Sequence, residues 1–221
     1  MKNLSHFLKK PEGKFIAVVG VIIVLLLAYY AFNAPSGTTP ATQQNITITN
    51  TDHIRGAKDG KLTLVEFGDF QCPACAVYEP VVRQVMKDNA TDLKIVFKQF
   101  PLYQIHPNAM LAAKATEAAG LQGKFWEMHD MLYDKQKDWS EGLNAHDFII
   151  TYATTIGLDV KKFEADLNDK ALEDKILAEE QEGIKLGVPG TPTFFLNGKM
   201  LESPRSLEEF DKIIKNALQG Q

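Results

Sequence analysis

A nearly continuous apolar segment, Lys61–Phe67 (KLTLVEF), leads directly toward the chain's two cysteines. Such a run of β-forming residues suits a strand that is covered on both faces of a sheet. Gly68 and Asp69 then favour a turn, and the apolar positions after Cys72 recur at helical spacing. Cys72 and Cys75 are therefore expected where a central strand passes into the first turn of a helix.

The pattern that follows is typical of an α/β fold with helices inserted into its middle. Leu93–Phe100 (LKIVFKQF) predicts the next strand, and residues 108–186 are helical in pattern almost throughout. Asn197-Gly198 predicts a hairpin. Helices that interrupt a set of strands in this way favour an α/β layout.

Weaker signals are found at the two ends of this region. Asn45–Thr49 alternates between polar and apolar residues, which favours an edge strand. Near the C-terminus, Ser206 followed by Glu209 predicts a capping box that opens a final amphipathic helix.

A second apolar segment, Phe15–Phe32, contains eighteen residues without a charge. As a helix it would be roughly 27 Å long, close to the hydrocarbon thickness of a bilayer. A cleaved signal peptide is the alternative, but its apolar core is usually about 7–15 residues and ends at a small-x-small site. Tyr29 and Phe32 stand where small residues would be required. We therefore expect a retained transmembrane anchor over 15–34.

Charge predicts the orientation of this anchor. Four lysines and one glutamate lie in the N-terminal tail, residues 1–14, so the positive-inside rule places the tail in the cytoplasm and the later residues outside. Residues 35–51 are polar and predict a linker to a domain at 52–221. Without the tail, the chain contains 20 Lys and Arg and 27 Asp and Glu residues, which gives a net charge of −7. This acidity argues against nucleic acid as a partner.

The cysteine pair has a specific chemical logic at a helix start. Unpaired N–H groups and the helix dipole stabilise a thiolate there, so Cys72 is expected to be the nucleophile and Cys75, one turn further in, the resolving thiol. Pro73 suits the first helical position. An incidental disulfide and a zinc site completed by two of the five histidines are the alternatives. Haem attachment is excluded because Ala76 follows the pair.

Motifs along the chain resemble the DsbA-like branch of the thioredoxin superfamily from about Asp52 to the C-terminus. The matching segments are Val65-Glu66-Phe67, Asp69-Phe70-Gln71, Cys72-Pro73-Ala74-Cys75, Phe97-Lys98-Gln99-Phe100-Pro101-Leu102, Gln122-Gly123-Lys124-Phe125-Trp126 and Gly187-Val188-Pro189-Gly190-Thr191-Pro192-Thr193-Phe194. The resemblance implies a thioredoxin fold with a helical insertion at about 108–186, preceded here by the predicted transmembrane helix.

The resemblance also implies roles for further residues. Pro192 matches the family's cis-proline beside the disulfide, and Thr191 would present its backbone to a substrate. Glu66 and Lys98 resemble the buried acid of the family and its basic partner, and the alternative is that both point to the sheet's edge. His106 and His129 are expected to serve packing or capping.

These features predict an extracytoplasmic protein thiol-disulfide oxidoreductase, most simply a dithiol oxidase acting on exported proteins. A reductase, an isomerase and a non-redox module that holds unfolded chains are the alternatives. The family implies a membrane redox partner of the DsbB or vitamin-K-epoxide-reductase (VKOR) type. We expect a monomer, with no metal and no cofactor beyond the Cys72–Cys75 disulfide.

Overall fold

The computed structural model describes residues 22, 23, 25, 26, 29, 43–202, 204 and 206–220. The chain divides into two compact units, Met1–Ala41 and Thr42–Gln221, and the strands of the described residues all lie in the second. Ile22, Ile23 and the few other described residues of the first unit are helical. Most of the predicted anchor, 15–34, and all of the tail, 1–14, lie outside the described residues. No helix within the described part of the chain is long and apolar enough to cross a bilayer.

A mixed five-stranded sheet forms the centre of the described domain, in the order β1-β3-β2-β4-β5. Its strands are β1 (His53–Gly56), β2 (Leu62–Gly68), β3 (Leu93–Gln99), β4 (Thr193–Leu196) and β5 (Lys199–Met200). β2 and β3 run parallel, while β1, β4 and β5 pair antiparallel with their neighbours. Central β2 is thus the strand that leads to the cysteines, as the apolar run predicts.

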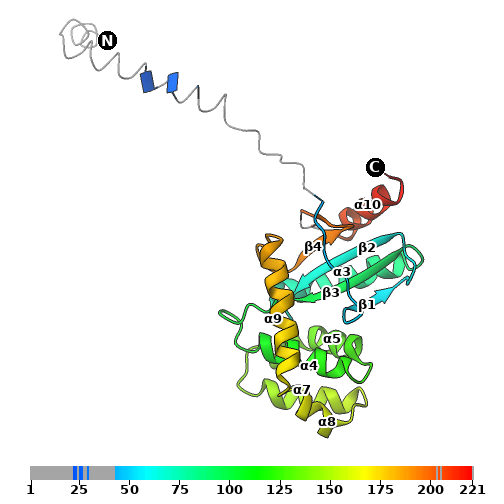
Figure 1. The fold of residues 1–221 in the computed structure, drawn as a ribbon, viewed down its shortest axis with the longest axis vertical. Coiled ribbons are helices and arrows are strands. Elements are labelled where there is room, and N and C mark those ends of the chain that lie inside the picture. Colours follow the sequence, from blue (N-terminus) through cyan, green and yellow to red (C-terminus); the bar gives the residue numbers. More distant parts are fainter. Residues whose placement is uncertain are drawn as a thin grey trace, which may run out of the picture. The chain divides into compact units, whose positions relative to one another are not determined.

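Helices cover both faces of this sheet and build a separate layer beside it (Figure 1). They are α3 (Pro73–Asp88), α4 (Ala109–Gly120), α5 (Phe125–Asp134), α6 (Gln136–Trp139), α7 (Ala145–Thr155), α8 (Val160–Asp166), α9 (Lys170–Lys185) and α10 (Leu207–Leu218). α3 and α10 pack on one face and α9 on the other. α4 to α9 all lie between β3 and β4 in the chain, so the predicted helical insertion is confirmed.

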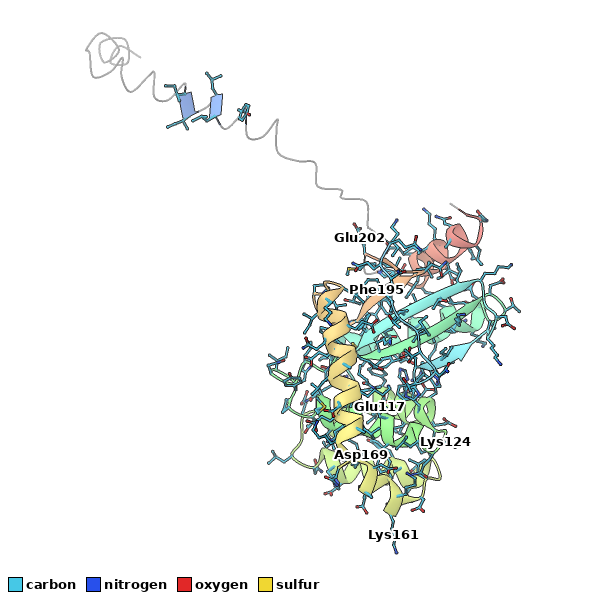
Figure 2. The ribbon with its side chains drawn as sticks, in the orientation of Figure 1. Glu117, Lys124, Lys161, Asp169, Phe195 and Glu202 are labelled. Atoms are coloured by element: carbon cyan, nitrogen blue, oxygen red, sulfur yellow. The ribbon has the colours of Figure 1, made fainter. Side chains whose placement is uncertain are left out.

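Strand alternation explains why the apolar runs are almost continuous. Leu62 and Leu64 of β2 face α3 and α10, whereas Val65 and Phe67 face the α9 side. Phe195 of β4 (Figure 2) belongs to the same cluster as Val65 and Phe67, and the centroids of the Phe195 and Phe67 rings lie 5.7 Å apart. Each fully buried side chain of this size contributes about 1.5–3 kcal/mol. Burial on both faces therefore supplies much of the stability of the sheet.

A close approach between α9 and the sheet depends on Gly183. A Cβ at this position would lie 2.7 Å from ring atoms of Phe100 and 3.0 Å from Phe67. Any larger residue would push the helix away from the sheet. Since α9 leads into the loop before β4, its distance from the sheet also sets the position of that loop.

The helical insertion has its own apolar core. Met128, Leu132, Trp139 and Phe163 are fully buried in it, and the Trp139 indole N–H donates to the Leu132 carbonyl at 2.9 Å. Lys161, on the far side of α8, points outward (Figure 2). The insertion is thus a packed layer rather than a mobile appendage to the sheet.

The predicted hairpin and the predicted cap of the final helix are confirmed, but the prediction of an edge strand at Asn45–Thr49 is wrong. Asn197 and Gly198 have φ of 49° and 80°, and the Ser206 hydroxyl accepts from the Glu209 N–H at 3.2 Å. Asn45–Thr49 forms no strand, because the Thr47 N–H donates to a Glu182 carboxylate oxygen instead of a neighbouring strand. The edge strand is His53–Gly56, which pairs with β3.

Candidate active site

Cys72 occupies the N-cap position of α3, and Pro73 follows it as the first helical residue. The Cys72 backbone is extended and its N–H donates to the Asp69 carbonyl at 3.1 Å, which closes the turn after β2. Cys72 is 7% exposed and Cys75 is fully buried, and both are free thiols. The predicted order, an outer and an inner thiol at a helix start, is what the structure shows.

The electrostatics of the two thiols differ strongly. The pKa of Cys72 is lowered from 9.0 to about 5 by a hydrogen bond from the Cys75 thiol, against the effect of partial burial, with further help from Thr191 and from the N–H groups of Cys75 and Ala74. Burial, followed by the interaction with Cys72 and the nearby Glu66, raises the pKa of Cys75. At neutral pH Cys72 is therefore a thiolate and Cys75 a thiol.

A buried carboxyl group lies beside the inner thiol. Glu66 is 1% exposed, and burial together with the charge of Glu79 raises its pKa well above 4.5. Its Oε2 has no hydrogen-bond partner among the described residues, and neither has the hydroxyl of buried Tyr133. The pKa of Tyr133 is raised by burial and by the charges of Cys75 and Glu66. These groups form a buried polar cluster around Cys75, of which sequence reasoning missed Tyr133.

The loop before β4 completes the site on the outer side. The Thr191–Pro192 peptide bond is cis, as the resemblance implies. The Cys72 sulfur lies 3.4 Å from the Thr191 carbonyl oxygen, to which the protonated thiol donates, across 119 residues of sequence. The Thr191 hydroxyl is buried with no other partner in the described part of the chain, and its hydrogen bond to the Cys72 thiolate helps to lower the pKa of that thiol. The structure therefore brings Thr191 and Pro192 to the outer cysteine.

Asp69 organises the turn that precedes the cysteines. One of its carboxylate oxygens accepts the Gln71 N–H at 2.8 Å. The other accepts the Leu102 N–H at 3.0 Å and pairs with His106 Nδ1 at 2.6 Å. His106 thus has the packing and capping role expected of it. The position of Asp69 within the motif just before Cys72 is the signal that could have indicated its role.

Side chains from the insertion hold the same turn from the other side. The Gln136 amide donates to the carbonyls of Phe70 and Cys72, at 2.8 and 2.9 Å. The Gln71 amide donates to the Ser140 carbonyl, and its oxygen accepts from the backbone of Asn108. These contacts span more than 30 residues of sequence, and sequence reasoning missed them. The insertion is therefore part of what positions Cys72.

Lys98 is not the partner of Glu66, and this prediction was wrong. In the parallel pairing of β2 and β3, Glu66 lies opposite Phe97, and Phe67 lies opposite Lys98. Because side chains alternate between faces, Glu66 faces α3 and Lys98 faces α9. Lys98 is buried there, with its ammonium 2.8 Å from Asp52 and 3.3 Å from Glu182. It takes no part in the cluster around Cys75.

His129 packs in an aromatic cluster, as expected. It is 2% exposed and lies edge-on to the rings of Phe70, Phe97 and Tyr133. Its neighbour Trp126 is partly buried and stacks under the guanidinium of a β1 arginine, Arg55, 4.3 Å from the ring centre. Phe125 is buried too, so the Phe125-Trp126 pair belongs to the core rather than to a substrate cage.

The one cluster of metal-ligating type among the described residues is formed by Glu79, His129 and Asp130. Arginines already neutralise it, since Arg83 Nε donates to Glu79 at 2.6 Å and Arg55 pairs with Asp130 at 2.8 Å. Against the effect of burial, the hydrogen bond from His129, followed by the pair with Arg55, lowers the pKa of Asp130 to about 2. The cluster is an ion-pair network, and neither cysteine belongs to it.

A cavity of about 490 Å³ opens beside the first turns of α3, and its lining includes Pro73, between the two cysteines, but neither cysteine. Pro73, Ala76 and Val77 of α3 form one wall, and residues 133–138 form the other. Val77 is 72% exposed. An acidic outer thiol with an apolar wall beside it can attack, or be attacked by, a sulfur of another polypeptide, while the buried inner thiol reacts only within the molecule.

Comparison with family models gives a match to thioredoxin over residues 48–216. The solved structures that resemble this chain share its fold. BdbD from Bacillus subtilis in its oxidised form has a TM-score of 0.69 at 22% identity, covering 81% of this chain and 99% of that one. The thiol-disulfide exchange protein α-DsbA2 from Wolbachia pipientis has a TM-score of 0.66 at 21% identity, covering 76% and 88%.

Curated proteins with similar sequence are much longer than this chain. The Na⁺/H⁺ antiporter NhaA 1 of Salinispora arenicola is 40% identical over 170 residues, which are 76% of this chain and 25% of that protein. The antiporter of the same name from Mycobacterium sp. strain KMS is 33% identical over 205 residues, 89% of this chain and 32% of the antiporter. The chain thus spans about a quarter to a third of these relatives.

Proposed function

This chain belongs to the thioredoxin family, and we propose that it is a thiol-disulfide oxidoreductase that works as a dithiol oxidase. The acidic thiol of Cys72, with a pKa of about 5, carries this proposal. A stabilised thiolate favours the reduced dithiol, so the corresponding disulfide gives up its oxidising equivalents readily. Thiols of this fold range from a pKa of about 7 in reductants to about 3.5 in strong oxidants.

The reaction follows from the positions of the two thiols. A substrate thiolate attacks the Cys72 sulfur of the disulfide, the Cys72–Cys75 bond breaks, and Cys75 leaves and takes up a proton. Glu66, whose pKa is raised, is the nearby carboxyl group able to supply that proton. A second substrate thiolate then attacks the substrate sulfur of the mixed disulfide. Cys72 departs as a stable thiolate, and two electrons have passed from substrate to enzyme.

The loop at Thr191 and Pro192 is proposed to dock the substrate. An extended segment can pair its backbone with this loop as an added strand does, which places a substrate sulfur next to Cys72. The exposed Val77 and the adjoining cavity provide apolar surface for side chains of an unfolded polypeptide. Exported proteins with free thiols are the substrates that this arrangement suits.

We further propose that the domain acts outside the cytoplasm, held by the apolar segment 15–34, as a monomer. There its dithiol would be reoxidised by a membrane redox partner of the DsbB or VKOR type. The apolar run and the lysines before it support this placement. An oxidising compartment is also where a protein oxidase can remain in its disulfide form.

A redox titration of the purified chain in glutathione buffers tests the direction of the reaction. An oxidase should have a reduction potential well above the value of about −270 mV found for thioredoxin and nearer to −120 mV. A potential near −270 mV would identify a reductase instead. A chain whose cysteines neither reduce nor reoxidise would be the non-redox binding module.

A further inference from the structure

Residues 43–52, called here the N-terminal strap, lie against the domain rather than standing off from it. The Gln44 N–H donates to the Gly198 carbonyl at 2.7 Å, and the Gln44 side-chain amide donates to the Leu186 carbonyl at 3.0 Å. Gln43 adds a bond to the Asn197 carbonyl at 3.3 Å. A Cβ on Gly198 would lie 2.3 Å from the Gln44 carbonyl oxygen, so the contact requires glycine there.

These contacts are placed on both sides of one functional segment. Leu186 is the C-cap of α9, directly before the loop that carries Thr191 and Pro192. Gly198 lies in the turn after β4, at the other end of the same stretch. Gln44 therefore bridges the two ends of the segment 187–197, whose middle contacts Cys72.

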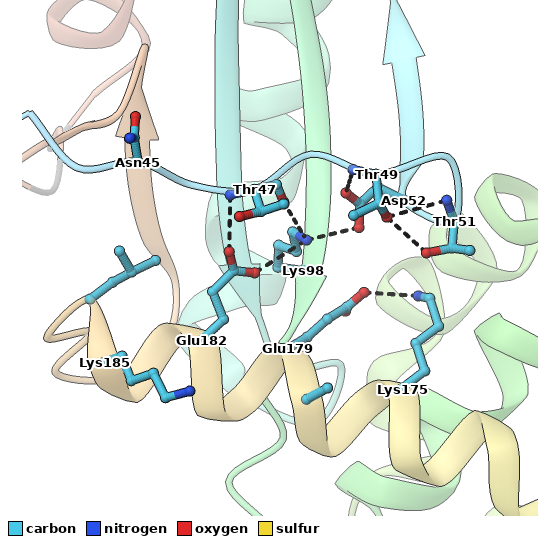
Figure 3. A pocket seen from close by; sticks show the side chains of 12 residues that line it. Asn45, Thr47, Thr49, Thr51, Asp52, Lys98, Lys175, Glu179, Glu182 and Lys185 are labelled. Carbon is cyan, nitrogen blue, oxygen red and sulfur yellow. Dashed lines mark hydrogen bonds and ion pairs between the residues drawn. The ribbon is translucent and has the colours of Figure 1, made fainter.

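Lys98 is the second attachment of the strap (Figure 3). Its ammonium lies 2.8 Å from Asp52 and donates to the Thr47 carbonyl at 3.2 Å. It also lies 3.3 Å from Glu182, which in turn accepts the Thr47 N–H at 3.0 Å. Glu182 is in the last turn of α9, so this ion-pair cluster joins the strap to the helix that leads into the active-site loop.

Polar contacts, rather than packing, hold the strap in place. A cavity of about 490 Å³ lies between it and α9, and one of about 220 Å³ lies on the side of β2 and the hairpin. Among strap residues, Ile46 packs against the buried core while Ile48 is 40% exposed. Lys98 and Asp52, by contrast, have side chains only 4% and 2% exposed. A buried ion pair adds little net stability but penalises any other arrangement.

We propose that Gln44 and Lys98 are positioning residues of the active site, which hold the segment 187–197 so that Thr191 stays in contact with Cys72. The inference deepens the proposed function and rests on it. The strap covers the second half of the predicted linker, residues 35–51, so part of the segment expected to connect the domain to its anchor also holds the active-site loop.

The test measures the acidity of Cys72 in the full-length, reduced chain, by titrating thiolate absorbance. Gln44→Ala removes the bond to Leu186, and Lys98→Met removes the charge from the cluster. Both should raise the pKa of Cys72 by about half a unit, because the Thr191 hydroxyl, whose hydrogen bond lowers that pKa, would no longer be held against the thiolate. Lys98→Arg, which keeps the charge and the donors, should restore the wild-type value.

Lys94→Met is the matched control, since Lys94 lies on the same face of β3 and makes none of the strap contacts. It should leave the pKa of Cys72 unchanged. A simple loss of stability would lower the unfolding temperature without moving that pKa, so thermal unfolding is recorded for every variant. If Lys98→Met fails to fold, the pKa of Cys72 in Gln44→Ala is sufficient to test the positioning role.

Unchanged Cys72 acidity in the folded Gln44→Ala variant would overturn the positioning role, whatever its stability. A wild-type chain with an unshifted Cys72, near its ordinary pKa, would instead mean that the proposed function fails before the strap is at issue. The two failures are therefore distinguished within one series of titrations.

Discussion

Cys72 Sγ lies 3.4 Å from the carbonyl oxygen of Thr191, although 119 residues separate the two in the chain. The contact joins the start of α3 to the loop between α9 and β4, and so it depends on the whole path of the helical insertion. The two thiols and the loop at Thr191 meet only because two distant parts of the sequence, the turn after β2 and the loop before β4, lie at the same edge of the sheet.

The reduced protein should be stabilised by the Cys72 thiolate in a defined pH range. Folding lowers the pKa of Cys72 from 9.0 to about 5. A lowered pKa contributes stability that is complete above pH 9 and is lost as the pH falls through 5. The unfolding free energy of the reduced wild type, relative to Cys72→Ala, should therefore increase between pH 5 and 9 in urea titrations. A difference that does not change with pH would contradict the acidic thiol.

The two cysteines should show different trapping behaviour. Cys75→Ser should accumulate mixed disulfides with exported proteins, because Cys72, the outer thiol, is still present and nothing within the molecule can release the adduct. Cys72→Ser should form none, since Cys75 is fully buried. Non-reducing electrophoresis, with and without dithiothreitol, detects these adducts. Trapping by Cys72→Ser alone would reverse the assignment of the two roles.

Glu66→Gln should separate stability from catalysis. Burial raises the pKa of Glu66 above 4.5, so its stabilising contribution is complete below pH 4.5 and is lost as the pH rises through the raised value. The variant should accordingly become more stable relative to the wild type as the pH increases. When Cys75 attacks a mixed disulfide, the first step of the reaction runs in reverse and Glu66 accepts the proton of Cys75. Without that acceptor, release of the mixed disulfide should become slower by about 10- to 100-fold.

Urea unfolding of the reduced forms and stopped-flow release of a peptide adduct measure these two effects of Glu66→Gln. Equal release rates in variant and wild type would show that protons reach Cys75 by another route.

Asp69→Asn should destabilise the turn that precedes the cysteines. Asp69 is buried, and its two oxygens together engage Gln71, Leu102 and His106. An asparagine amide has one oxygen, so it can replace only one of the two carboxylate oxygens as an acceptor. We therefore expect a loss of about 1–3 kcal/mol in unfolding free energy. Asp88→Asn, at the exposed end of α3, is the control and should change stability by less than about 0.5 kcal/mol.

The apolar segment 15–34 should retain the full-length protein in the membrane. After salt and carbonate washing the chain should stay in the pellet, because a run of this length matches the bilayer core. Protease added from outside should reach the domain. A soluble mature form beginning near residues 32–35 would instead show that the segment is a cleaved signal peptide.

Features that depend on neighbouring residues could be predicted from the sequence. The run Lys61–Phe67 indicated a strand with two covered faces, and Asn197-Gly198 indicated the hairpin, because these structures follow from local patterns of burial and backbone preference. The position of Cys72 at a helix start followed from the same local pattern. A lowered thiol pKa was expected there from the physics of helix ends, and in the structure the hydrogen bond from the Cys75 thiol is its largest cause.

Only the tertiary structure decided which distant residues meet. Glu66 and Lys98 are both buried, but the pairing of β2 with β3 places them on opposite faces of the sheet. A shift of β3 by one residue would have placed Lys98 on the same face as Glu66. The strap contacts of Gln44, the partners of Asp69 and the edge strand at His53–Gly56 are likewise set by how elements pack together. Local patterns carry no information on that packing, because the free energy that selects it comes from contacts between segments far apart in the chain.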